Sequence, residues 1–259
     1  SPFPGLDTGT FFEKEKMMTA RITSDQKQFK RFVEDASNRA LKKVPLDKDG
    51  LQRLFSRGGE FQSHVIDGIS RFSSGKHPAA ELLEEYFQNV YDLTLDLANV
   101  QFPKKKGFTT WMAVPAEIDR DTIMKCVSEY FKVGSYAWKT PIAANIDRKL
   151  EQKRPQGLYV FAHRGGDEPD DVHRNKSHDD GMAQNLIFLN PKEYLLASGF
   201  HRYIKGYFMD RKGWTRTSSL WSAGYLVLGS WNDASALLCL SFGSREDRSP
   251  GRGLREAVF

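Results

Sequence analysis

Cysteine is scarce in this sequence, with only Cys126 and Cys239 among 259 residues. Two isolated cysteines cannot form the disulfide framework of a small secreted domain or the paired cysteines of a structural zinc site. No apolar run approaches the roughly 20 residues that cross a bilayer. The opening stretch SPFPGLDTGTFFEKEK also lacks the charged-then-apolar order of an export signal. We therefore expect a soluble protein without a membrane span or an export signal, for which a virion and the cytoplasm are both compatible locations.

A strong charge of one sign is missing as well. The 38 Lys and Arg residues outnumber the 33 Asp and Glu residues only slightly, which leaves a net charge of +5. This excess is too small to predict a nucleic-acid partner. The chain also lacks a Gly-x-Ser-x-Gly elbow, a Walker loop and a His-Glu-x-x-His motif. We expect no specific nucleic-acid binding, no cofactor and no metal site.

The first part of the chain has helical periodicity. In residues 79–98 the apolar side chains recur at helical spacing, and a lysine-rich amphipathic helix is predicted in residues 26–43. The character changes near residue 101, where GFTTWMAVP has the composition of a strand and residues 118–131 follow as a helix capped by Asp119. We therefore expect an α-rich N-terminal region at residues 1–100 and a second domain at residues 101–259.

The second domain combines helices with short strands. Asn190, Pro191 and Glu193 form a helix start with a capping box, and Gly199 would end that helix. After residue 205 the helical periodicity gives way to short apolar runs separated by glycines, which is typical of antiparallel strands joined by tight turns. The predicted fold class is α+β.

One segment resembles an enzyme motif. AHRGG, which contains His163 and Arg164, resembles the first-strand motif of the glycerophosphodiester phosphodiesterases, a family of metal-dependent (β/α)8 barrels. That family continues with a Glu-Asn-Thr step, where this chain has Pro169 to Val172, and a barrel needs ~200 further residues where only 95 follow Arg164. The other interpretation is an exposed acidic loop at residues 167–180, which could still take up a cation. A metal-dependent phosphodiesterase therefore stays as an alternative function.

The C-terminal part carries a second resemblance. Residues 188–259, with the step VLGSW and the ending GLREAVF, resemble the end of a C-type lectin domain of the formylglycine-generating-enzyme subtype. The block is more similar still to the variable proteins of diversity-generating retroelements, which use this fold to display a randomised segment. The enzyme branch of the family acts through two neighbouring cysteines, whereas Cys126 and Cys239 are far apart in this sequence.

The resemblance implies a set of site residues within a variable segment at about residues 221–259. Fixed scaffold positions would include Trp214, Trp221, Trp231, Gly229, Arg245 and Arg255. The displayed ligand contacts would be Ala223, Leu228, Asn232, Ala234, Ser235, Leu237, Phe242, Ser244, Asp247, Ser249 and Arg252.

These residues imply a non-enzymatic ligand-binding protein of a virus, prophage or microbe. Its partner is expected to be a macromolecule, a protein rather than a sugar, because the implied contacts mix apolar and polar side chains. A structural virion or cell protein that binds nothing through this surface is the third alternative.

Overall fold

The computed structural model describes residues 76–147 and 150–259, together with nine isolated positions between residues 28 and 57. The chain divides into two compact units, Ser1–Gly68 and Ile69–Phe259. The helix predicted in residues 26–43 lies for the most part outside the described residues. The helical segment predicted in residues 79–98 belongs to the second unit, although the sequence analysis assigned it to the N-terminal region.

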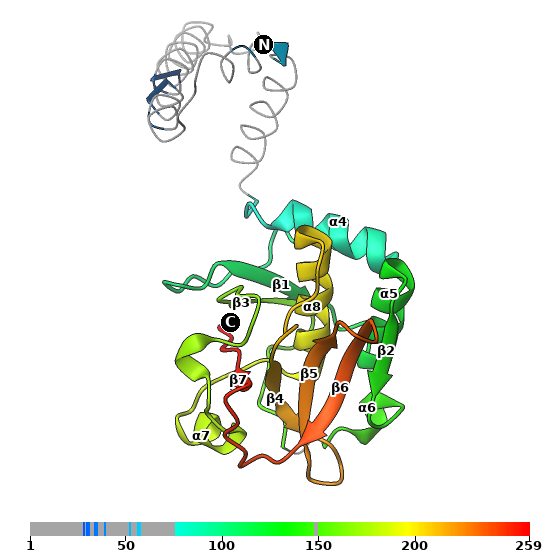
Figure 1. Ribbon diagram of the computed structural model, residues 1–259. Coiled ribbons are helices and arrows are strands. Elements are labelled where there is room, and N and C mark those ends of the chain that lie inside the picture. Colours follow the sequence, from blue (N-terminus) through cyan, green and yellow to red (C-terminus); the bar gives the residue numbers. More distant parts are fainter. Residues whose placement is uncertain are drawn as a thin grey trace, which may run out of the picture. The chain divides into compact units, whose positions relative to one another are not determined.

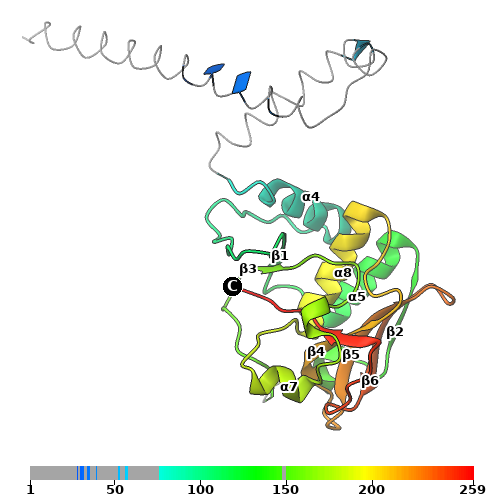
Figure 2. The ribbon, with the colours of Figure 1, turned by 60° about the vertical axis from the view of Figure 1, so that its left-hand side comes forward.

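Three helices form one layer of the second unit, and they lie together in Figures 1 and 2. Helix α4 spans Ala80–Tyr91 and buries an apolar face that includes Leu83, Tyr86 and Phe87. Helix α5 spans Arg120–Phe131 and begins where the Asp119 side chain accepts a hydrogen bond from the Thr122 backbone N–H at 2.7 Å. Helix α8 spans Pro191–Lys205. These elements confirm the helices predicted from periodicity and capping residues.

The predicted end of α8 is wrong. The capping box of Asn190 and Glu193 is present, but the helix continues past Gly199 and ends at Gly206, which adopts a left-handed φ of 85°. Gly199 is a close-approach position, because a Cβ atom there would lie 2.4 Å from the Tyr86 hydroxyl oxygen on α4. The glycine thus allows two helices to pack closely and does not terminate one of them.

The strands form two separate sheets. Strands β1 (Thr110–Val114) and β3 (Tyr159–His163) pair antiparallel in a two-stranded sheet. The other sheet has the order β2-β6-β5-β4-β7. Its strands span Gly134–Ala137 (β2), Trp214–Leu220 (β4), Leu226–Asn232 (β5), Leu237–Gly243 (β6) and Arg252–Leu254 (β7).

Both ladder types occur in the larger sheet. Strands β4, β5 and β6 are antiparallel neighbours, whereas the short edge strands β2 and β7 run parallel to β6 and β4. Three short helical elements lie in the connections: α6 (Ile142–Asn145), the 3-10 turn η1 (Asp171–His173) and α7 (His178–Ala183). The second unit is therefore a mixed structure of helices and two sheets, in agreement with the predicted combination of α and β elements.

The main core lies between α8 and the sheets. Helix α8 contacts β1, β4 and β5, and Tyr194 of α8 lies against Gly229 of β5. Val227, Leu238 and Leu240 point from the sheet into this core, whereas Leu226 and Leu228 join a smaller apolar cluster on the opposite face. The alternation of side chains along β5 therefore decides which positions support α8 and which do not.

Candidate functional site

The strand register separates the predicted contact residues into two groups. Leu226 pairs with Gly243 at one end of the β5–β6 ladder, and Asn232 pairs with Leu237 at the other end. Six residue steps along β5 separate these pairs by about 20 Å, because a strand rises roughly 3.3 Å per residue. Ala223, Phe242 and Ser244 belong to the first end of the sheet, and Asn232, Ala234, Ser235 and Leu237 belong to the second. The structure thus does not bring the predicted set together on one patch.

The first end carries an exposed group of aromatic rings, which we call the aromatic surface (Trp138, Tyr225 and Phe242). The ring centroids of Trp138 and Phe242 lie 4.4 Å apart, and Tyr225 contacts both rings at 5.4 and 5.6 Å. Tyr225 is 47% exposed and Phe242 is 43% exposed. Contiguous exposed aromatic side chains are typical of interaction sites.

A fixed frame supports the aromatic surface. Trp221 is fully buried beneath it, and its indole N–H donates to the Ser241 carbonyl at 3.0 Å. The Trp221 backbone N–H donates to the Tyr225 carbonyl at 2.7 Å, and Gly224 in the same turn has a left-handed φ of 82°. This turn holds Ala223 and Tyr225 at fixed positions, both exposed to solvent.

Two members of the aromatic surface were not predicted. Trp138 follows β2, and its backbone N–H donates to the Leu240 carbonyl on β6. The pairing of β2 with β6 joins segments about one hundred residues apart in the chain. The aromatic residues of GSYAWK are therefore the only local signal that could have indicated the place of Trp138 in this surface. Tyr225 stands next to the turn glycine Gly224, a neighbourhood that favours exposure.

Leu228 is wrongly predicted as a displayed contact. It is only 2% exposed and packs with Leu220, Leu226 and the ring of Trp214 on the second face of the sheet. The loop of residues 244–251 contacts this face, because its Asp247 carbonyl accepts a hydrogen bond from Arg216, which faces the same side as Leu228. Both the Leu228 side chain and the Arg252 guanidinium lie close to Gly243. The interior position follows from this cover, which alternation along one strand cannot reveal.

Asp247 and Arg252 act within the framework. The Asp247 backbone carbonyl accepts a hydrogen bond from Arg216 at 2.7 Å, and its carboxylate accepts one from Arg252 at 2.5 Å. Arg216 is fully buried, and this burial lowers its pKa although the Asp247 carboxylate opposes the shift. Ser249 is half-buried in the same loop. Because a buried guanidinium depends on Asp247, this residue is unsuited to free exchange.

The predicted scaffold residues occupy different environments. Arg255 is fully buried beside Asp210, and Gly229 admits the Tyr194 ring. Trp214 and Trp231 are half-buried, whereas Arg245 is exposed and pairs with Asp179 at 2.8 Å.

The phosphodiesterase-like segment forms a different local structure from that of the enzyme. His163 ends β3, which pairs antiparallel with β1 and forms an isolated antiparallel bridge from Ala162 to Val258. A (β/α)8 barrel is built of parallel strands, so this pairing differs from that of the enzyme family. Burial, together with the charges of Arg255 and His201, lowers the pKa of His163 to about 3. Arg164 contacts Asp170 and Glu256 at 3.4 and 2.8 Å.

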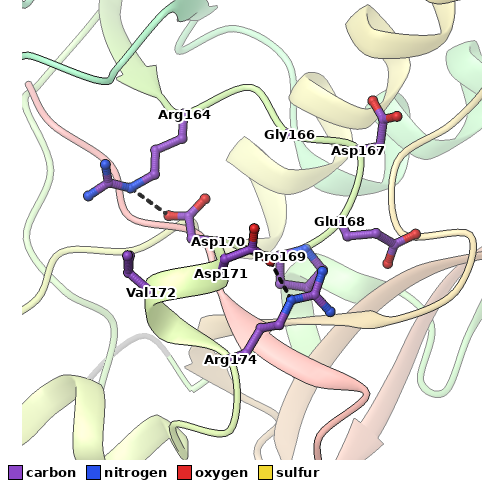
Figure 3. Close-up of a pocket in the computed structure, with 9 residues that line it drawn as sticks. All are labelled: Arg164, Gly166, Asp167, Glu168, Pro169, Asp170, Asp171, Val172 and Arg174. Carbon is purple, nitrogen blue, oxygen red and sulfur yellow. Dashed lines mark hydrogen bonds and ion pairs between the residues drawn. The ribbon is translucent and has the colours of Figure 1, made fainter.

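A pocket of about 420 Å³ lies along the acidic loop (Figure 3). Two of its carboxylates have cationic partners at 2.7 Å, Asp171 with Arg174 and Asp167 with Lys205. Glu168 accepts a hydrogen bond from the Lys212 backbone N–H at 3.0 Å. Across residues 76–147 and 150–259, no three His, Cys, Asp or Glu side chains come together in a group that could hold a metal ion.

Comparisons with family models, with curated proteins and with solved structures find no match for this chain. In the described part of the chain, no helix is both long enough and apolar enough to span a membrane.

Proposed function

We propose that this chain is a non-enzymatic ligand-binding protein with a C-type-lectin-like fold, whose C-terminal surface is diversified by a retroelement to recognise protein partners. The recognition surface in this proposal is the aromatic surface together with the neighbouring Ala223 and Ser244. The observation that carries the proposal is the contact among three aromatic rings, two of which are more than 40% exposed, above a fully buried Trp221.

The chemistry of this surface favours a protein partner. Aromatic side chains dominate the binding energy of protein interfaces because they bury a large area at a small cost in conformational entropy. Lys139 lies over the Trp138 ring at 4.9 Å from its centroid and adds a positive charge beside the rings. A partner with an apolar depression and an acidic rim would complement both features.

The buried residues beneath the aromatic surface allow the exposed side chains around it to be exchanged. Ala223 and Ser244 lie in connections between strands, and both are exposed, so their replacement leaves the core contacts of Trp221 and Leu240 in place. Substitutions at exposed positions of this kind usually change stability by less than about 0.5 kcal/mol. A fold of short strands around a helical layer is also compatible with the lectin-like part of the proposal.

Sequencing of the natural gene tests the proposal. The codons for residues 221–259 would be compared with those of a neighbouring near-copy beside a reverse transcriptase gene. We expect differences at the exposed positions Ala223, Asn232, Ala234, Ser235, Phe242 and Ser244, and none at the buried or ion-paired positions Leu228, Asp247 and Arg252. A near-copy that differs mainly at the buried or ion-paired positions, or the absence of any near-copy, would contradict diversification.

A further inference from the structure

A small pocket lies at the end of the larger sheet opposite the aromatic surface. Residues 211–214 and residues 230–234 line it, and its volume is about 320 Å³. This volume falls at the lower end of the range for small-molecule sites. The pocket lies apart from the aromatic surface, but its lining includes Asn232 and Ala234, two of the positions expected to vary under the proposed function.

Two tryptophans line the pocket from opposite faces of the sheet, because Trp214 faces the same side as Ser230 whereas Trp231 faces the side of α8. Trp231 is held by stacking on Phe208, with ring centroids 4.4 Å apart, and by a hydrogen bond from its N–H to the Asp233 carboxylate at 2.6 Å. Trp214 packs against the apolar cluster of Leu226 and Leu228. An aromatic ring beside the pocket favours a ligand with a flat apolar body.

The side-chain acceptors of the pocket are already engaged. The Asp233 carboxylate accepts hydrogen bonds from Arg211 at 2.9 and 3.1 Å as well as from Trp231. The Asn232 side-chain oxygen accepts hydrogen bonds from the backbone N–H groups of Ala234 and Ser235 at 3.0 and 3.2 Å. A ligand that needs acceptors would find none of these oxygens free.

Several donors of the pocket are unused. The Ser230 hydroxyl is buried and has no hydrogen-bond partner in the part of the chain that the structure describes. Within the described residues, the Trp214 indole N–H, the Asn232 amide and the Lys212 ammonium also have none. A buried polar group without a partner costs free energy, and a ligand acceptor that reaches it removes that cost.

We propose that this pocket binds a carboxylate attached to a planar apolar group. The free donors and the positive charge of Lys212 would receive the carboxylate, and the Trp214 ring, on the same face of the sheet as Ser230, would pack against the apolar group. A free aromatic acid and the C-terminal carboxylate of a peptide that ends in an aromatic residue share this chemistry.

Titration of the full chain, labelled with nitrogen-15, tests the proposal through the indole N–H signals. The Trp214 signal is assigned with Trp214→Phe. The probes are two carboxylates, benzoate and acetyl-Ala-Ala-Phe. The corresponding amides, benzamide and acetyl-Ala-Ala-Phe amide, are the uncharged controls. We expect saturable shifts of the Trp214 signal with the two acids only. The acid that binds more tightly shows whether the ligand is a free aromatic acid or the C-terminus of a peptide. Equal binding of acids and amides, or no saturable shift at millimolar concentrations, would overturn the proposal.

Substitutions in the pocket give a second readout. Lys212→Gln should weaken binding of the tighter acid by about fivefold, as expected for an exposed ion pair. Ser230→Ala should weaken it by about tenfold, because a hydrogen bond to a charged group is lost. Lys125→Gln on α5, another exposed lysine, is the matched control and should change nothing. An equal loss in the control, or unchanged binding in both pocket variants, would refute the assignment.

Discussion

At the scale of single residues, Arg255 and Asp210 form an ion pair in the interior of the second unit. Both side chains are fully buried, and their nearest nitrogen and oxygen atoms are 2.5 Å apart. Thr215 completes the network, because it accepts a hydrogen bond from Arg255 at 2.9 Å and donates one to Asp210 at 2.6 Å. Arg255 also donates to the Gly166 carbonyl at 2.8 Å. This network ties the C-terminal segment to the start of β4.

Asp210→Ala should strongly destabilise the protein. The substitution leaves the Arg255 charge buried without its carboxylate, which typically costs about 3 to 5 kcal/mol of unfolding free energy. Urea denaturation followed by circular dichroism measures this loss. The control is Glu129→Ala, which removes an exposed pair with Lys125 and should cost no more than about 0.5 kcal/mol. Similar losses in the two variants would contradict the role given to the buried pair.

The sequence could predict residue environments where local patterns decide them. Exposure of Ala223, Asn232 and Ser244 agrees with their places beside turn residues and strand ends. Leu228 and Asp247 could not be predicted in the same way. The burial of Leu228 and the Asp247 contact with Arg216 both depend on contacts between different strands and loops, which a local pattern does not encode.

At the scale of elements, close approach between α8 and β5 depends on a missing side chain. A Cβ atom at Gly229 would lie 2.3 Å from Cε1 of the Tyr194 ring. Tyr194 is itself fully buried, so its ring has little room to move. The helix and the sheet can keep this spacing only with glycine at position 229.

Gly229→Ala should therefore lower the free energy of unfolding by about 1 to 3 kcal/mol, the usual cost of overpacking a core. Gly251→Ala is the matched control, because nothing lies within 4 Å of its Cβ position. Thermal unfolding of both variants measures the difference. Equal melting temperatures for the two variants would show that the helix and the sheet can separate without cost.

Helices with capping residues could be predicted from the sequence, whereas the pairing between distant strands could not. The caps at Asp119 and Asn190 fixed the starts of α5 and α8, because side-chain oxygens satisfy backbone N–H groups there. The parallel pairing of β2 with β6 has no local signal, since it joins residues far apart in the chain. The end of α8 was mistaken because Gly199 serves helix packing.

At the scale of the whole molecule, the second unit combines a helical layer with a sheet whose two ends have different chemistry. The aromatic surface at one end carries exposed rings, and the pocket beside Trp231 at the other end is small and rich in donors. The sequence indicated a variable C-terminal segment, but the strand register distributes that segment over both ends. Prediction of the site therefore failed at the level of register, which depends on pairing between strands.

A randomised library tests the central claim, that the residues of the aromatic surface can be substituted without unfolding the protein. This library randomises four positions, Ala223, Tyr225, Phe242 and Ser244, and keeps Trp221. The fraction of folded molecules is measured on a display platform before and after selection for binding to lysozyme. A matched library randomises Arg216, Leu228, Asp247 and Arg252. We predict that most members of the first library stay folded and yield binders, whereas most members of the second unfold. Equal unfolding in the two libraries, or no binders from the first, would contradict the account.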